Sequence, residues 1–195
     1  DRGKLVQLRH WQGDLICDIL RLTPEGRRAY QLYELWIARK NSKSLLGAGL
    51  AIDGLFDEPG AEVYSCAGDK DQAKLVFGEV KTAVQMDPEL DKILNCWRDV
   101  IEYPALGSIY RALSSDAPLK EGLNPSRVLF DELHVQHDDE LWNVMNQGSD
   151  TRQHPLVVSL STFGVMTDRL GNDSLGYREY QEAADFGTTN PRSRA

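Results

Sequence analysis

The sequence LWIARKNSKS occupies residues 35–44, where an apolar run gives way to charged and hydroxyl side chains. The apolar part predicts a buried strand within residues 28–37, and the Leu- and Ala-rich stretch 45–56 predicts a helix. A phosphate-binding loop needs this strand–loop–helix order, with a Lys for the phosphates and a hydroxyl for Mg²⁺. Lys43 and Ser44 occupy the last two places of that pattern. A solvated basic turn is the alternative interpretation of the same residues.

Two later strand ends carry side chains that phosphoryl transfer uses. Asp131 and Glu132 follow the apolar run 128–130, where one carboxylate could lie beside Mg²⁺ and the other beside an attacking water. Ser161 and Thr162 end the next apolar run, and hydroxyls there can sense a γ-phosphate. Solvated acids and hydroxyls that cap a turn are the alternatives. Together, in this order, the three strand ends predict a P-loop ATPase, because ligands in such sheets bind at the carboxyl ends of strands.

The remaining pattern alternates strands with helices. Further helices are expected over residues 5–22, 70–86 and 87–97, and further strands over 61–66, 108–113 and 156–160. This alternation predicts an α/β fold with a central, mostly parallel sheet and helices on both faces. An additional strand between the loop and the acidic pair fits the catalytic-glutamate (ASCE) type of P-loop ATPase. The 195 residues suffice for one domain, placed at residues 1–186, with the polar residues 187–195 as a tail or linker.

Composition limits the classes of function. The formal net charge of −8 argues against a broadly basic surface, although a local Lys and Arg patch could still contact DNA. No apolar stretch approaches the roughly 20 residues of a membrane-spanning helix, so no membrane partner is expected. Cys17, Cys66 and Cys96 are odd in number and widely spaced. They predict buried thiols in a reducing cytoplasm, and neither a disulfide nor a zinc framework.

Several motifs resemble the N-terminal ATPase domain of the tailed-phage terminase large subunit, of the long-tailed phage type. Residues 39–44, RKNSKS, resemble that family's phosphate loop, which begins with Arg and lacks the first glycine. The other matching segments are, in order, 60–64 with Gln72-Ala73, 113–116, 122–126, 129–134, 152–156 and 161–164. The resemblance runs from about Leu8 to Tyr180, so it covers nearly the whole chain.

The resemblance implies roles for individual residues. Lys43 would bind the β and γ phosphates of ATP, while Ser44 and Asp131 would hold Mg²⁺. Glu132 would activate the hydrolytic water, and Arg39 would contact the γ-phosphate and report hydrolysis.

The resemblance also implies an adenine-reading element and a complete nucleotide-binding loop. Trp11 and Gln12 resemble the element that precedes the core, where a Gln amide can pair with the adenine edge; a surface amide on an ordinary helix is the alternative. The other nucleotide-binding residues of the loop would be Lys40, Asn41 and Ser42.

Movement and assembly involve a further set of residues. Ser161 and Thr162 would couple hydrolysis to movement of the domain. Motors of this type work as rings, in which an arginine from a neighbouring subunit reaches the γ-phosphate. Arg111 and Arg152 are the candidates for this arginine finger, and a salt-bridged surface arginine is the alternative for each. His134 is expected to be a structural neighbour and not a metal ligand.

Two residues depart from the family pattern. Ser42 stands where the family has Gly, and its β-carbon would crowd the phosphates if the loop needs a positive φ. Phe163 replaces a small residue of the coupling motif. The family also has a C-terminal nuclease domain with clustered acids, which no residue after Tyr180 supplies, so no nuclease activity is expected from this chain.

The expected function is Mg²⁺-dependent ATP hydrolysis that drives double-stranded viral DNA into a procapsid. The expected partners are DNA, the portal protein, the small terminase subunit and further copies in a ring, in the host bacterial cytoplasm at the portal. A nucleotide-binding assembly module with little hydrolysis is the alternative, on account of Ser42. A helicase-type ATPase lacks support, because the sequence shows no second helicase-like domain.

Overall fold

The structure is a computed structural model that describes residues 7–38, 40–115, 122–132, 140–148, 152–162, 167, 173–186 and 193–194. The strands are β1 (Leu32–Trp36), β2 (Glu62–Ala67), β3 (Asn95–Cys96), β4 (Ile101–Tyr103), β5 (Ser108–Ser114), β6 (Arg127–Asp131), β7 (Leu156–Ser161) and β8 (Ser193–Arg194). The helices are α1 (His10–Ile19), α2 (Lys43–Asp57), α3 (Lys70–Met86), α4 (Leu90–Ile93), α5 (Glu140–Gly148) and α6 (Leu175–Phe186). The fold is therefore of the α/β class.

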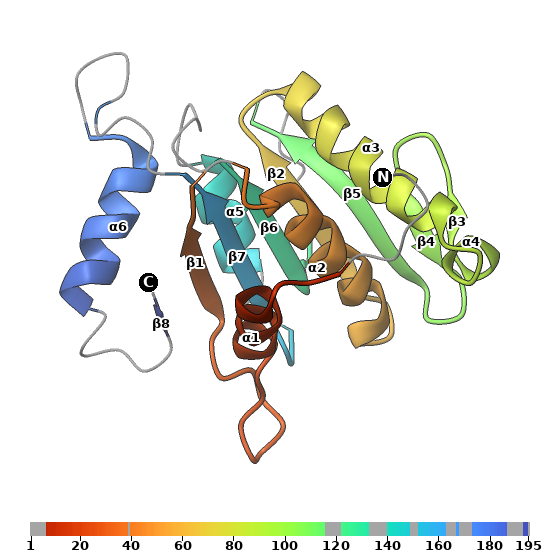
Figure 1. Cartoon of the computed structure of the whole chain (residues 1–195), viewed down its shortest axis with the longest axis horizontal. Coiled ribbons are helices and arrows are strands. Elements are labelled where there is room, and N and C mark those ends of the chain that lie inside the picture. Colours follow the sequence, from red (N-terminus) through yellow and green to blue (C-terminus); the bar gives the residue numbers. More distant parts are fainter. Residues whose placement is uncertain are drawn as a thin grey trace.

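The strands form one sheet with the order β3-β4-β5-β2-β6-β7-β1-β8. Neighbours from β5 to β8 run parallel, and only the pairs β3–β4 and β4–β5 are antiparallel. Strand β7 lies between β1 and β6 (Figure 1). Strand β7 follows the acidic pair in the sequence, but in the sheet it lies between the loop-bearing strand β1 and the acidic strand β6.

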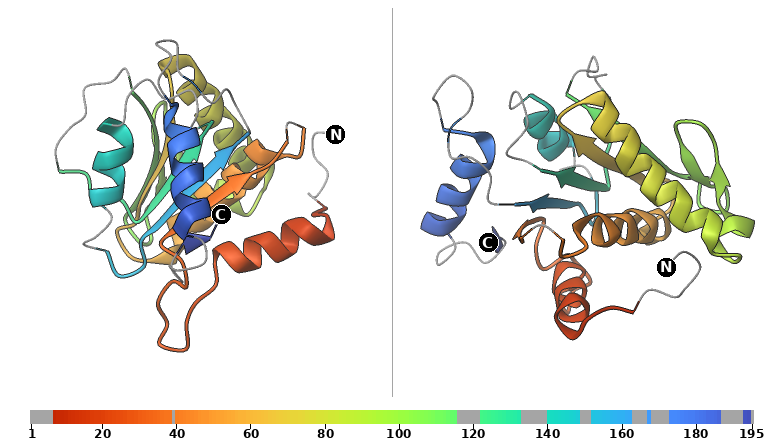
Figure 2. Two further views of the ribbon diagram at one scale, coloured as in Figure 1. Left: turned by 90° about the vertical axis from the view of Figure 1, so that its left-hand side faces the viewer. Right: turned by 45° about the horizontal axis from the view of Figure 1, so that its top comes forward.

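Helices cover both faces of the sheet, as predicted (Figure 2). On one face α1, α2 and α3 pack on alternate strand residues such as Val63, Leu129 and Val158. On the other face α5 inserts Leu141, Trp142 and Met145 against the intervening strand residues, which form a second core cluster. Alternation along each strand thus gives the central strands two buried faces, which explains their continuous apolar runs.

Helix α2 lies close to the sheet because it carries small residues on its inner face. A β-carbon on Gly54 would lie 2.9 Å from Val63 Cγ2 and 3.0 Å from Arg127 Cδ. Because real β-carbons do not approach so closely, only glycine fits there. This close approach holds the last turn of α2 against β2 and β6, while its first turn carries Lys43 and Ser44.

The structure corrects the expectation of a helix over residues 87–97. Helix α4 is only four residues long and is followed by β3, which pairs with β4 and so extends the sheet. Leu94 is buried, but Ile93 and Trp97 are exposed, and Trp97 Nε1 donates a hydrogen bond of 2.8 Å to Glu102. Pairing with the next strand, β4, which itself pairs with β5, therefore overrides the helical spacing of the apolar residues.

Several other features differ from expectation. Helices α5 and α6 and strand β4 were not predicted, and Ser193–Arg194 pairs with β1 inside the segment expected to be a tail. Cys66 is buried, and burial raises the pKa of its thiol, but Cys17 is exposed, so the prediction of buried thiols is wrong for Cys17. Within the described ranges, the structure contains no helix with the length and apolar character of a membrane span.

Candidate nucleotide site

The connection between β1 and α2 has the geometry of an anion-binding loop. Helix α2 begins at Lys43, so the unpaired N–H groups of its first turn face the loop. Two non-glycine residues of the loop have left-handed backbone, Lys40 with φ 68° and Ser42 with φ 62°. Asn41 Nδ2 donates a hydrogen bond of 3.1 Å to Ala38 O, which closes the turn. Arg39, the candidate γ-phosphate contact, lies outside the described residues.

Ser42 occupies a position that suits glycine. It is the N-cap residue of α2, but its side chain makes no capping hydrogen bond, so Ser42 gives the helix only its backbone carbonyl, which accepts from Leu46 N at 3.0 Å. A left-handed conformation costs a residue with a β-carbon roughly 1–2 kcal/mol. The loop therefore does need a positive φ where the family pattern has glycine.

The carboxyl end of β6 places Glu132 against the loop. Lys43 Nζ donates to Glu132 Oε1, and Thr162 Oγ1 donates to Glu132 Oε2 at 2.9 Å. Glu132 also has left-handed backbone, with φ 54°. Three segments far apart in the sequence thus meet at one carboxylate, at the edge where β1, β6 and β7 end.

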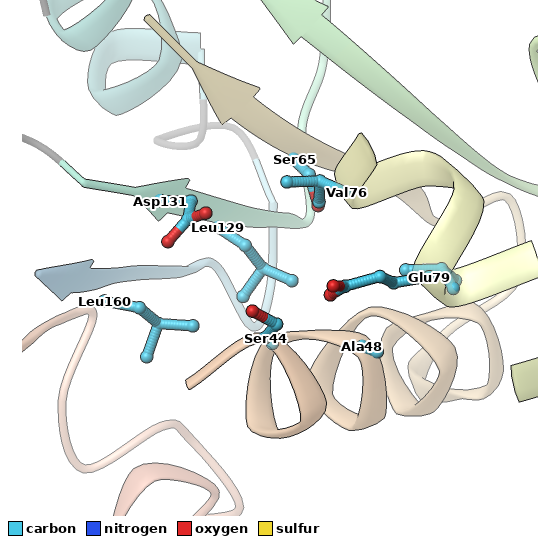
Figure 3. A pocket seen from close by; sticks show the side chains of 10 residues that line it. Ser44, Ala48, Ser65, Val76, Glu79, Leu129, Asp131 and Leu160 are labelled. Atoms are coloured by element: carbon cyan, nitrogen blue, oxygen red, sulfur yellow. The ribbon is translucent and has the colours of Figure 1, made fainter. Parts of the chain in front are cut away.

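Ser44 and Asp131 line one cavity at this edge, together with residues of α2, α3 and the neighbouring strands (Figure 3). Burial has the largest effect on the pKa of Asp131 and raises it. The charge of Lys43 lowers this pKa, and the charge of Glu132 raises it. Gln72 Nε2 also lies 3.4 Å from Asp131 Oδ2, within donating distance. A hydroxyl and a carboxylate are the hard oxygen ligands that Mg²⁺ prefers, so this pair fits the ion that the fold family implies.

The proposed adenine-reading residues lie on α1. Gln12 is buried and its Oε1 accepts a hydrogen bond of 2.9 Å from Arg9 N, so the amide oxygen caps the start of α1. The alternative of a surface amide is therefore wrong, because Gln12 has a buried structural role in the helix cap. Trp11 is 38% exposed.

The two candidate arginine fingers have different surroundings. The Arg152 guanidinium donates to Asn124 O at 2.7 Å and 2.9 Å, to Gly60 O at 3.1 Å and to Glu58 at 3.2 Å. These partners precede β2 and β6, at the amino edge of the sheet, opposite the loop. The structure therefore disfavours Arg152 as a finger, because its donors are already occupied. Arg111 on β5 is exposed.

Of the coupling residues, Thr162 contacts the acidic pair through its side-chain hydroxyl. Ser161 is buried, and its backbone carbonyl accepts from Ile37 N at 3.0 Å. The position of Phe163, and that of His134, falls in parts of the chain that the structure does not describe.

The sequence interpretation did not include two polar residues of α3, Gln72 as a neighbour of Asp131 and Glu79 as a lining residue of the cavity. They are seven positions apart, with Val76 between them, so they lie on one face of α3. That spacing is visible in the sequence, but it does not distinguish a helix face that lines a cavity from one that faces solvent.

The chain has the P-loop ATPase fold of the catalytic-glutamate type. Its loop between β1 and α2 leads to Lys43, and its acidic pair, Asp131 and Glu132, lies at the end of β6. Residues 24–180 match the protein family described as "Terminase large subunit, ATPase domain". The chain belongs to this family, since the match covers most of its length.

Curated relatives agree with the family match. The chain is 26% identical to the "Terminase, large subunit" of Enterobacteria phage HK97 over 168 residues, which are 82% of this chain and 32% of that protein. It is 23% identical to the terminase large subunit of Lactococcus phage p2, over 77% of this chain and 29% of that protein. The chain thus spans about a third of the length of these relatives.

Solved structures share the fold. The crystal structure of the HK97 large terminase matches with a TM-score of 0.81 and 22% identity, over 97% of this chain and 39% of that one. The large terminase of a thermophilic bacteriophage, solved in complex with ADP, matches with a TM-score of 0.63 and 9% identity, over 96% of this chain and 44% of that one.

Proposed function

We propose that this chain binds ATP with Mg²⁺ at the carboxyl edge of its sheet and hydrolyses it to drive double-stranded viral DNA into a procapsid. The observation that carries the proposal is the convergence of Lys43, Asp131, Glu132 and Thr162 on one site, in a chain of the terminase ATPase family. The ADP in the large terminase of the thermophilic bacteriophage gives further support to nucleotide binding.

The residues of the site would act in turn on the nucleotide. Lys43 donates to the β and γ phosphates, and in doing so it leaves Glu132, which it contacts in this structure. Glu132 then accepts a proton from the attacking water, as a positioned general base. Ser44 and Asp131 would hold Mg²⁺, whose charge would neutralise the negative charge that develops on the phosphates.

Thr162 offers a physical link between hydrolysis and movement. Its hydroxyl, which follows β7, donates a hydrogen bond to Glu132, which follows β6. A shift of the Glu132 carboxylate on loss of the γ-phosphate would therefore alter this hydrogen bond and pass the change to β7. In a ring of subunits on the portal, the exposed Arg111 is the preferred finger for a neighbouring site. The proposed partners are DNA, the portal protein and the small terminase subunit, and the place is the host cytoplasm at the portal.

Binding tests the proposal more directly than turnover, because an isolated subunit lacks a neighbour's arginine. We expect calorimetric titration with a non-hydrolysable ATP analogue and Mg²⁺ to give saturable binding. Lys43→Ala should weaken this binding by about 100-fold or more, because it removes the charge that meets the phosphates. Lys40→Ala is the matched control, a loop lysine whose removal should weaken binding less. Absence of binding by the unmutated chain would refute the nucleotide site.

The left-handed backbone of Ser42 favours a second function, a nucleotide-binding assembly module with little hydrolysis. The two functions differ in turnover once portal and DNA are present. For the motor, hydrolysis should rise on assembly, and Glu132→Gln should lower it by about 100-fold or more while binding persists. An assembly module should show equally low hydrolysis with and without Glu132.

A further inference from the structure

Helix α3 contributes a charged residue to the cavity beside the phosphate loop. Glu79 and Val76 line this cavity together with Ser44 of α2 and Asp131 of β6. In Figure 3 the Glu79 carboxylate points into the cavity from α3, between the helices and the strand ends. The pattern of phosphate-loop residues assigns no role to this glutamate, because α3 is not part of the loop.

The surroundings of Glu79 contain an acid and a hydroxyl. Burial raises the pKa of Glu79, the Ser44 hydroxyl lowers it by hydrogen bonding, and Asp131 raises it. None of these groups is a cation, whereas the neighbouring Glu132 is paired with Lys43. Glu79 and Ser44 therefore line the same cavity from two helices, while the loop lysine pairs with Glu132 and not with Glu79.

A serine that ligates a metal has a requirement that Glu79 meets. When the hydroxyl oxygen gives a lone pair to Mg²⁺, its proton must point away from the ion and find an acceptor. Acceptors of this kind orient the ligand and increase its donor strength. Glu79 faces the cavity from α3, on the helix side of Ser44, so it suits a role behind this ligand.

We infer that Glu79 is a positioning residue of the metal end of the nucleotide site, which accepts a hydrogen bond from the Ser44 hydroxyl and thereby turns the hydroxyl oxygen toward Mg²⁺. This inference rests on the proposed function of the site. Glu79 acts through Ser44 and touches neither the nucleotide nor the reacting atoms.

The test separates metal-dependent from metal-independent binding. A non-hydrolysable ATP analogue is titrated into the unmutated chain, Glu79→Gln, Ser44→Ala and the double variant, each with Mg²⁺ and with EDTA. We expect Glu79→Gln to weaken binding about 10-fold in Mg²⁺ and to leave it unchanged in EDTA, as is typical for partners of metal ligands. The double variant should bind like Ser44→Ala, because Glu79 has no effect without the hydroxyl.

Asp71→Asn is the matched control, an exposed acid on the same helix that pairs with Lys74 at 2.9 Å. It should change neither titration. Three results would overturn the inference. Glu79→Gln could weaken binding of the analogue equally with and without Mg²⁺, or it could leave binding unchanged in both. In the double variant, the loss of affinity could be the sum of the losses of Glu79→Gln and Ser44→Ala. If the unmutated chain itself fails to bind, the proposed function fails as well, and that result differs from all of these.

Discussion

The two edges of the parallel sheet use charged residues in opposite ways. At the amino edge, buried arginines have several fixed partners: Arg127, 1% exposed, donates to Asp53 at 2.6 Å, to Asp57 at 3.1 Å and to Leu50 O at 2.8 Å. At the carboxyl edge, Lys43 has Glu132 as its partner, and the backbone of both Ser42 and Glu132 is left-handed. At the amino edge the charged side chains pair with fixed partners of the fold. At the carboxyl edge a negatively charged ligand could replace Glu132 as the partner of Lys43.

The difference shows where stability and function lie in this domain. Arg127 joins the start of β6 to the end of α2, and Arg152 joins the segments before β2 and β6, so these arginines tie the chain together. On the other edge, Lys40 and Ser42 keep a backbone conformation that is costly for residues with a β-carbon, and strain of this kind clusters at ligand-binding sites. Changes at the amino edge should therefore alter folding, and changes at the carboxyl edge should alter binding.

The largest effect is expected at the amino edge. Arg127→Ala should lower the free energy of unfolding by about 3–5 kcal/mol, because it removes a fully buried side chain together with its hydrogen bonds to Leu50 O, Asp53 and Asp57. Urea denaturation measures this loss, and the exposed Arg27→Ala should change stability by less than about 0.5 kcal/mol. Nucleotide affinity of the folded variant should stay unchanged. A loss below about 1 kcal/mol would show that water replaces Arg127 well, and the contrast between the edges would fail.

An intermediate effect is expected at Glu34, a buried acid in the middle of β1. Its Oε1 atom has no hydrogen-bond partner among the described residues. Burial, followed by Glu179 and Glu182 of α6, raises its pKa to about 7 from 4.5. The unfolded chain therefore releases this proton at lower pH than the folded chain does. The contribution of Glu34 to stability is complete below pH 4.5 and is lost as pH rises to about 7.

Glu34→Gln should remove this pH dependence. Relative to the unmutated chain, the variant should gain stability as pH rises, by on the order of 3 kcal/mol at pH 8 and by little near pH 4.5. Denaturation midpoints at a series of pH values measure the difference. The exposed Glu89→Gln is the control and should change stability by less than about 0.5 kcal/mol at every pH. A constant difference between Glu34→Gln and the unmutated chain would contradict the prediction.

The smallest effect is expected in the loop. Ser42→Gly should raise the free energy of unfolding by about 0.5–1 kcal/mol, because relief of the left-handed strain exceeds the entropy that glycine adds to the unfolded chain. Asn41→Gly, at a neighbour whose φ is not positive, should instead lower it. Thermal unfolding compares the two variants. Equal destabilisation by both would mean that the loop of the folded protein does not keep Ser42 left-handed.

Much of the candidate site was predictable because its residues lie at strand ends with distinctive neighbours. Lys43-Ser44 and Asp131-Glu132 each come after an apolar run, so the neighbouring residues in the sequence are enough to place both pairs at strand ends. Glu79 carries no such local signal, because a polar residue on an amphipathic helix looks the same whether it faces solvent or a cavity. Arg152 shows the converse, since its sequence context suggested a finger while its three hydrogen-bond partners, Glu58, Gly60 and Asn124, come from distant segments.

Local patterns in the sequence were enough to establish the alternation of strands and helices, the α/β class and the place of the phosphate loop, because apolar periodicity and turn residues act over short distances. Tertiary packing set the rest: which edge each arginine occupies, that residues 94–103 pair as strands beside β5, and that Gln72 and Glu79 face Asp131 and Ser44. The contacts of the arginines and of α3 depend on burial between segments far apart in the chain. The β3–β4–β5 pairing joins neighbouring segments, but it depends on the edge that β5 offers to β4, so the apolar spacing of residues 87–97 does not contain it.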